Sequence, residues 1–306
     1  MKALVLLALC AALVRAEDVI RVELGSGPPP APQPLPELPP GESPRYHERV
    51  GVPLAEELKR SEAARGAGGR IVGGLGSYVG EHPFFAGLVI SLTSGQTSVC
   101  GAALVSNWRL VTAAQCWWDG RAQAYSITAV LGSVRLFSGG TRVAASAVLA
   151  HADYSPATLA NDIAVLVVPY VATTSTISPI ALPEGTELVN SFAGFVATAI
   201  GYGKTSDWAS ITTSAALRDV RVPVLSNAEC AQWYGALVTG GVLCSSGAGA
   251  RGPCGGDGGG PLALQYNGRR LLIGVVSFVS AAGCQRGEPA GHTRLSAYAG
   301  WVRAQL

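Results

Sequence analysis

The chain has 306 residues and a formal net charge of +2 at pH 7. Charged residues make up 14% of it and hydrophobic residues 48%, which is enough to bury the core of one large all-β domain or two smaller ones. The weak positive charge is not clustered, so the sequence argues against a nucleic-acid-binding face.

The first 16 residues have the features of a signal peptide. Lys2 supplies a positive start, and residues 3–14 form an apolar run that is too short to span a bilayer. A buried core helix is the alternative, which the position at the very N-terminus disfavours. No later stretch is long and apolar enough for a membrane span, so we predict a secreted, extracellular protein with no membrane partner.

Residues 17–70 differ in composition from the rest of the chain. Ten prolines fall between Pro28 and Pro53, and the segment contains no cysteine. Such a segment builds no core, so we expect it to be extended or disordered, apart from a short charged helix over residues 56–65. It ends in a glycine-rich stretch at Arg70, where a protease is expected to cut.

Six cysteines remain after Cys10 is assigned to the signal peptide. An even number behind a signal peptide predicts three disulfides in an oxidising compartment, although spacing alone leaves every pairing open. A zinc site is the alternative, but no CxxC pair or histidine cluster supports one, so we predict no metal and no cofactor. The six are Cys100, Cys116, Cys230, Cys244, Cys254 and Cys284.

From residue 71 onward, short β-type runs alternate with turn residues. This spacing is typical of a β-barrel or sandwich. The runs are 84–90, 127–131, 163–168, 195–200 and 271–276, with a turn at Asn267-Gly268. Near the end, Leu295, Tyr298, Trp301 and Val302 recur at helical spacing, which predicts a terminal helix over residues 296–306.

Four stretches occur together in the order found in the trypsin/chymotrypsin family. They are RIVGG at 70–74, LVTAAQC at 110–116, NDIAVL at 161–166 and CGGDGGGP at 254–261. Residues 71–306 therefore resemble that family, and the sequence of residues 284–291 is similar to that of insect larval chymotrypsins. The resemblance implies an all-β fold of two six-stranded antiparallel barrels, about 71–185 and 186–306, with a C-terminal helix and a cleft between the barrels. It also implies the disulfides Cys100–Cys116, Cys230–Cys244 and Cys254–Cys284.

The resemblance places Gly258 at the serine nucleophile and Gln115 at the histidine base, while Asp162 keeps its identity. Glycine has no side chain to attack a carbonyl, and a carboxamide does not titrate or shuttle a proton. Loss of either group costs on the order of 10⁶ in turnover. The sequence therefore predicts a chain that is not an active enzyme.

The carboxylate of Asp162 needs partners if it is buried. The Gln115 amide can donate to it much as an imidazole would, and Ser277 can donate as well. Uptake of a proton by Asp162 is the alternative. The four histidines outside the lost base position are interpreted as structural, so none is expected to rescue catalysis: His47, His82, His151 and His292.

Two parts of the family's machinery are expected to survive. Cleavage at Arg70–Ile71 would free an amine to pair with Asp257 and order the loop, unless these residues are merely inherited. The backbone amides of Gly256 and Gly258 would still form an oxyanion hole.

The specificity pocket is predicted to be altered. Gly252 stands where trypsin-like members carry an acidic residue, which excludes a preference for basic side chains. Val279 stands where glycine is usual, so it narrows the entrance to small apolar groups. The backbone of residues 277–279 offers pairing to an extended peptide. The residues predicted to form the pocket are Gly252, Ser277, Phe278, Val279, Ala290 and His292.

The leading hypothesis is a secreted, non-catalytic serine protease homolog that binds a peptide, a protease inhibitor or a secreted partner protein. A decoy for dietary inhibitors in an insect gut would fit the larval resemblance and the use of 19 arginines against 3 lysines. A regulatory cofactor of an active protease is a second version. The alternatives are an active serine endopeptidase with small apolar specificity, and a structural or storage protein.

Overall fold

The computed structural model describes residues 18–25, 45–64, 76–204, 206–207 and 216–306. The predicted signal peptide and the predicted cleavage junction, Arg70 and Ile71, lie outside these residues. No described helix is long and apolar enough to cross a membrane.

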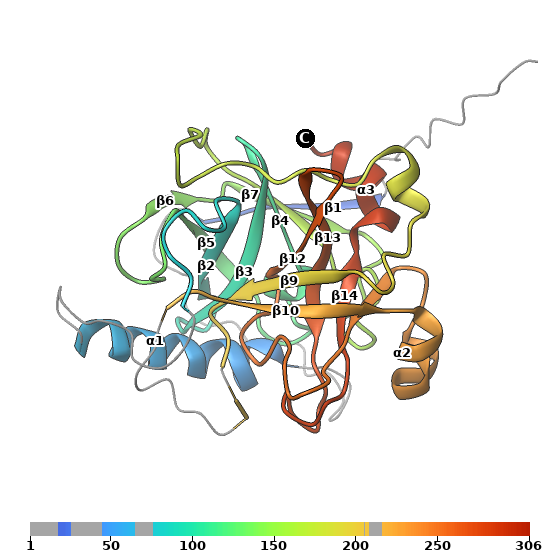
Figure 1. Ribbon diagram of the computed structural model, residues 1–306. Helices are drawn as coiled ribbons and strands as arrows, with labels where there is room; N and C mark the ends of the chain where they lie inside the picture. The colour runs from blue at the N-terminus through green and yellow to red at the C-terminus, as the bar shows by residue number, and fades with distance from the viewer. Residues whose placement is uncertain (1–17, 26–44, 65–75, 205, 208–215) are drawn as a thin grey trace, which may run out of the picture.

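The N-terminal half forms one curled antiparallel sheet (Figure 1). Its strand order is β1-β7-β8-β4-β3-β2-β5-β6. The strands are β1 (Val19–Glu23), β2 (Phe85–Leu92), β3 (Thr97–Ser106), β4 (Arg109–Thr112), β5 (Ala124–Leu131), β6 (Thr141–Ala144), β7 (Ala147–His151) and β8 (Ala164–Val167).

The C-terminal half forms a closed six-stranded barrel in the order β10-β11-β14-β13-β12-β9. The strands are β9 (Val196–Gly201), β10 (Arg218–Leu225), β11 (Val242–Ser245), β12 (Pro261–Tyr266), β13 (Arg269–Phe278) and β14 (Ala290–Arg294). Helix α2 (Asn227–Tyr234) follows β10, and helix α3 (Leu295–Arg303) ends the chain. The Asn267-Gly268 turn joins β12 to β13 with both residues at positive φ, as this dipeptide favours.

The predicted all-β class and the C-terminal helix are confirmed, and so is a six-stranded C-terminal barrel. The N-terminal half differs, because its described strands form an eight-stranded sheet rather than a six-stranded barrel. One added strand is β1, which comes from the predicted pro-segment and pairs antiparallel with the edge strand β7, with Val19 opposite His151. An unpaired strand edge readily accepts such an addition.

The prediction that residues 17–70 build no core is wrong for residues 45–64, whereas β1 is an extended strand and the predicted short helix is present with an earlier start. Besides β1, residues 45–64 form a π-helical turn (His47–Gly51) that runs directly into helix α1 (Val52–Ala64). Helix α1 starts earlier than the predicted 56–65 because Leu54 and Leu58 bury themselves completely against the domain. Figure 1 shows α1 lying along one side of the molecule, where it packs against β3. The high proline content of residues 17–70 thus led to a prediction that missed the apolar face of α1.

The three expected disulfides are present: Cys100–Cys116, Cys230–Cys244 and Cys254–Cys284. The first joins β3 to the 3₁₀ turn Ala114–Cys116 after β4, and the last ties the loop before β12 to the loop before β14. These bonds hold the segments that surround the predicted site.

Candidate active site

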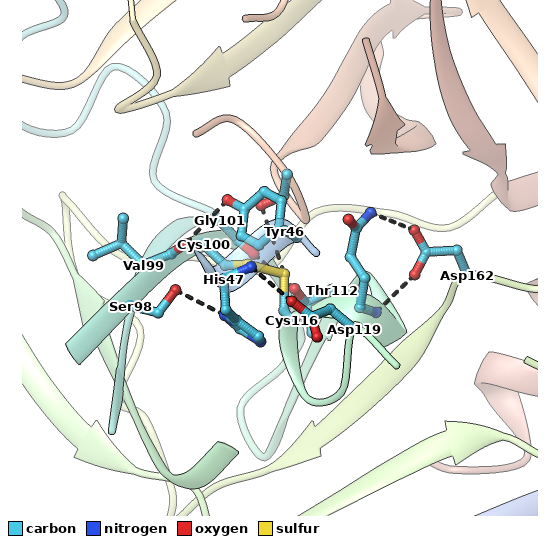
Figure 2. The surroundings of a disulfide bond; sticks show 12 residues. Tyr46, His47, Ser98, Val99, Cys100, Gly101, Thr112, Cys116, Asp119 and Asp162 are labelled. Carbon is cyan, nitrogen blue, oxygen red and sulfur yellow. Dashed lines mark hydrogen bonds between the residues drawn. A yellow bond between two sulfur atoms is a disulfide. The ribbon is translucent and has the colours of Figure 1, made fainter. Parts of the chain in front are cut away.

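Asp162 is fully buried and carries a complete set of donors. The Gln115 side-chain amide donates to Asp162 Oδ2 at 2.7 Å and its backbone N–H donates to Oδ1 at 2.9 Å. The Ser277 hydroxyl donates to Oδ2 at 2.6 Å. Figure 2 shows a hydrogen bond to each of the two carboxylate oxygens of Asp162. Both donors expected from the sequence therefore contact the carboxylate.

Gln115 is held on both sides. The 3₁₀ turn Ala114–Cys116 places it beside Asp162, and its Nε2 also donates to the Ser277 carbonyl at 2.6 Å. Both amide hydrogens of Gln115 are thus hydrogen-bonded, and the residue is 1% exposed. A carboxamide fixed in this way stabilises a buried carboxylate but transfers no proton.

Burial raises the pKa of Asp162 to about 6, against the lowering effect of the bonds from Ser277 and Gln115. The carboxyl is therefore mostly ionised at neutral pH and takes up a proton as the pH falls through 6. The sequence left two states of Asp162 open. The hydrogen-bonded carboxylate is the main state above pH 6, and the protonated acid is the main state below it.

Gly258 lies against a side chain from the N-terminal segment. A Cβ atom built on Gly258 would stand 2.7 Å from Cε2 of Tyr46 and 3.2 Å from its hydroxyl oxygen. Tyr46 donates a hydrogen bond to the Val99 carbonyl at 3.0 Å, and it is buried next to the Cys100–Cys116 bond (Figure 2). Tyr46 thus fills space that a side chain at position 258 would need.

The loop around Gly258 keeps its internal bonding. Asp257 accepts backbone hydrogen bonds from Gly203 at 2.8 Å and from Cys254 at 2.9 Å, and burial raises its pKa to about 6. Gly256 has a φ of 104°, and a Cβ there would lie 2.1 Å from Leu54 Cδ2. The two expected oxyanion glycines, 256 and 258, therefore both face the N-terminal segment.

The residues predicted to form the pocket do not all line one cavity. Ser277, Phe278 and Val279 line a cavity of about 430 Å³ with Gly258. Its other wall is made by residues of the N-terminal segment, namely Tyr46, Arg49 and Val50.

The remaining three predicted pocket residues do not line the 430 Å³ cavity. Gly252 lines a cavity of about 210 Å³ beside Asp257. His292 lines a third cavity, of about 330 Å³, which Ser277 and Phe278 also line, and Ala290 is buried in β14. Among the described residues, no single cavity therefore holds the whole predicted set, although Ser277 and Phe278 line both the cavity beside Gly258 and the one beside His292.

Three of the four histidines contact structural partners. His292 is fully buried, its Nε2 lies 2.9 Å from Ser245 Oγ, and burial lowers its pKa to about 3. His82 Nε2 lies 3.0 Å from Asp219 Oδ2. His151 packs its ring against two aromatic side chains of α3, Tyr298 and Trp301.

His47 is fully buried in the π-helical turn of the N-terminal segment. Its Nδ1 is 2.8 Å from Ser98 Oγ, its backbone N–H donates to Asp119 at 2.8 Å, and burial lowers its pKa to about 4 (Figure 2). The sequence assigned no site role to His47, Tyr46 or Leu54. One signal was present, since Val50, Leu54 and Leu58 recur at four-residue spacing.

Two clusters of the described residues each bring together three residues of types that can bind a metal. In one, Asp207 lies near Cys254 and Cys284, which are bonded to each other. In the other, Glu81, His82 and Asp219 meet, but their atoms bond to neighbouring groups of the chain. Neither cluster supports a metal site.

The fold and the cleft together define a chymotrypsin-like scaffold. The Trypsin family model matches residues 71–302, and the chain belongs to this family. It is 37% identical over 236 residues to "Collagenase" of Hypoderma lineatum, covering 77% of this chain and 86% of that protein. It is 36% identical to "Brachyurin" of Leptuca pugilator (77% and 98%) and 33% identical to "Serine protease 1" of Drosophila melanogaster (77% and 85%).

Solved structures agree with this assignment. The structure titled "HL collagenase structure at 1.7A resolution" matches with a TM-score of 0.69 and 35% identity, covering 77% of this chain and 98% of that chain. The family match begins at residue 71, so β1 and α1 lie outside it.

Proposed function

We propose that this chain is a secreted, non-catalytic member of the trypsin family that binds a peptide, a protease inhibitor or a secreted partner protein at its cleft. The proposal rests on the side chains found at positions 258 and 115. Gly258 offers no nucleophile and packs against Tyr46, and Gln115 offers no proton acceptor of the required basicity.

The remaining groups favour binding over hydrolysis. A triad of this kind acts as a unit, and its removal leaves only about 10³–10⁴ in rate over water from binding and the oxyanion hole. The 430 Å³ cavity with Ser277–Phe278–Val279 along one wall suits a short extended peptide. Gly252 provides no acid for a basic side chain, so small apolar groups are the expected ligands. Three disulfides are in keeping with secretion.

Hydrolysis and binding can be measured on one sample of the full chain. We expect no cleavage of peptides with small apolar residues, and binding of a protein-type chymotrypsin inhibitor by calorimetry. Hydrolysis that Asp162→Asn abolishes would instead support an active endopeptidase, the activity that the relatives' names suggest. Absence of both would move the function to another surface and favour a structural or storage role.

We further propose that cleavage at Arg70–Ile71 still changes the loop around Asp257. In support, a cavity of about 210 Å³ adjoins the Asp257 carboxylate, and an amine in it would relieve the cost of burying that charge. The cut form should show slower hydrogen exchange in residues 250–262 than the uncut form. Equal hydrogen exchange in the cut and uncut forms would mean that cleavage has no effect on this loop and that Asp257 has no role in such a switch.

A further inference from the structure

Residues 45–64, called the cleft segment below, lie outside the family match and yet occupy the family's central cleft. The segment comprises the π-helical turn and α1. Leu54 and Ala55 are fully buried, Leu58 is 1% exposed and Tyr46 is 8% exposed. All four belong to the same hydrophobic core as the N-terminal sheet. The segment is therefore packed as part of the domain rather than lying loosely on it.

The segment fits because the cleft has glycines where it passes. Built Cβ atoms would lie 2.7 Å from the Tyr46 ring at Gly258 and 2.1 Å from Leu54 Cδ2 at Gly256. At Gly255 the built Cβ would lie 3.6 Å from Val50 Cγ1, an ordinary contact. Carbon atoms do not approach closer than about 3.4 Å without cost, so a serine at 258 and the observed Tyr46 position exclude each other.

Polar contacts fix the segment at both ends. At its start, the His47 N–H donates to the Asp119 carboxylate at 2.8 Å. At its end, the Glu62 carboxylate accepts three hydrogen bonds, from the backbone N–H groups of Leu136 at 2.8 Å and Phe137 at 3.1 Å and from the Ser138 hydroxyl at 2.7 Å. Three donors converging on one carboxylate set the register of the helix.

The position of the segment limits what else can enter the cleft. Tyr46 already uses the Val99 carbonyl as an acceptor, and Tyr46, Arg49 and Val50 form a wall of the 430 Å³ cavity. A peptide that follows the 277–279 strand ends at this wall. A chain that continues past Gly258 meets the Tyr46 ring.

We infer that the cleft segment is a built-in ligand of the cleft, and that a protein inhibitor or a continuous peptide binds across Gly258 only after this segment has left. The inference rests on the proposed binding function and adds its regulation. The segment contains no cysteine, so contacts alone hold it. If the docked form holds nine-tenths of the molecules or more, the apparent affinity for a competing ligand falls by about tenfold or more.

The test uses the full chain and three variants. Leu54→Asp places a charge in the buried face of α1, and Glu56→Gln changes an exposed residue of the same helix as its control. Gly258→Ser is a second route to displacement, with Gly240→Ser as its control because a Cβ at Gly240 meets nothing within 4 Å. Hydrogen exchange is followed in residues 45–64, in the cleft residues 254–258 and in β12–β13. A protein-type chymotrypsin inhibitor is titrated by calorimetry.

The expected result is slow exchange of residues 45–64 in the unaltered chain and in both controls. In Leu54→Asp and Gly258→Ser, exchange should rise in residues 45–64 and 254–258 while β12–β13 stay protected, and the inhibitor should bind about tenfold more tightly or better. Greater exchange without inhibitor binding would support the docked segment and refute the proposed ligand. Equal inhibitor affinity in all forms, or fast exchange of residues 45–64 in the unaltered chain, would overturn the inference.

Discussion

The surroundings of Asp162 and those of Gly258 differ in what fills the space beside each residue. Around Asp162 polar groups fill the space, because Gln115 and Ser277 donate hydrogen bonds to the buried carboxylate. Around Gly258 the side chain is absent, and Tyr46 from outside the family domain takes the space.

The difference follows from the cost of leaving each group unsatisfied. A buried charge without donors costs several kcal/mol, so a substitution beside Asp162 must still donate hydrogen bonds. A missing apolar or small side chain leaves a void, and a neighbouring ring can fill a void. A residue beside Asp162 must therefore be able to donate hydrogen bonds, whereas the space beside Gly258 only has to be filled.

The largest effect is expected at the filled position. Leu54→Ala should weaken docking of the cleft segment by about 2–5 kcal/mol, because Leu54 is fully buried. Hydrogen exchange of residues 52–64 measures this loss directly. Glu56→Ala, on the exposed side of the same helix, should change it by less than about 0.5 kcal/mol. Equal effects of the two changes would mean that α1 is not packed as described.

The pH dependence sharpens the comparison at Asp162. Its pKa is about 6 in the folded chain and 3.8 without burial, so the folded state holds the proton more tightly. Its contribution to stability should be complete below pH 4 and be lost as the pH rises through 6, by up to about 3 kcal/mol. Denaturant unfolding at several pH values, compared with Asp162→Asn, isolates this slope. Parallel curves for the two proteins would contradict the raised pKa.

The amide of Gln115 should have a smaller effect on stability. Gln115→Leu removes the donor to Asp162 Oδ2 and to the Ser277 carbonyl, which should destabilise the fold by about 1–3 kcal/mol and raise the pKa of Asp162 further. The matched change Gln265→Leu, at an exposed position of β12, should be close to neutral. A neutral Gln115→Leu would show that Ser277 and the backbone satisfy Asp162 by themselves.

The smallest effect is expected at the rim of the cleft segment. Lys59 donates to Thr97 at 2.9 Å and lies 5.2 Å from the centre of the Phe137 ring, but it is exposed. Lys59→Ala should reduce docking by less than about 1 kcal/mol, and added salt should remove part of that difference. A larger loss of docking free energy, measured by hydrogen exchange of residues 52–64, would mean that the charged side chains of α1 hold it in place more than its buried apolar face does.

Much of the fold could be predicted from local patterns. The β-type runs, the Asn267-Gly268 turn and the terminal helix depend on residue types close in sequence, and each lies where the pattern indicated. The donors to Asp162 could be predicted as well, because a buried carboxylate restricts which side chains stand beside it. The division of the predicted pocket between separate cavities could not, since it depends on how loops meet in space.

From the residues alone one could predict the family and the three disulfide pairs that it implies, and one can read that position 258 holds glycine and position 115 glutamine. That these two residues replace a nucleophile and a base remains a prediction, which rests on the chemistry that each side chain can perform. The three-dimensional packing was needed to reveal that β1 extends the N-terminal sheet and that residues 45–64 lie against the glycines of the cleft. Those contacts join residues more than fifty positions apart in the chain, such as Tyr46 and Val99 or Glu62 and Leu136. Proline-rich composition describes a segment's own propensity, but it does not describe the apolar surface that the rest of the chain offers to it.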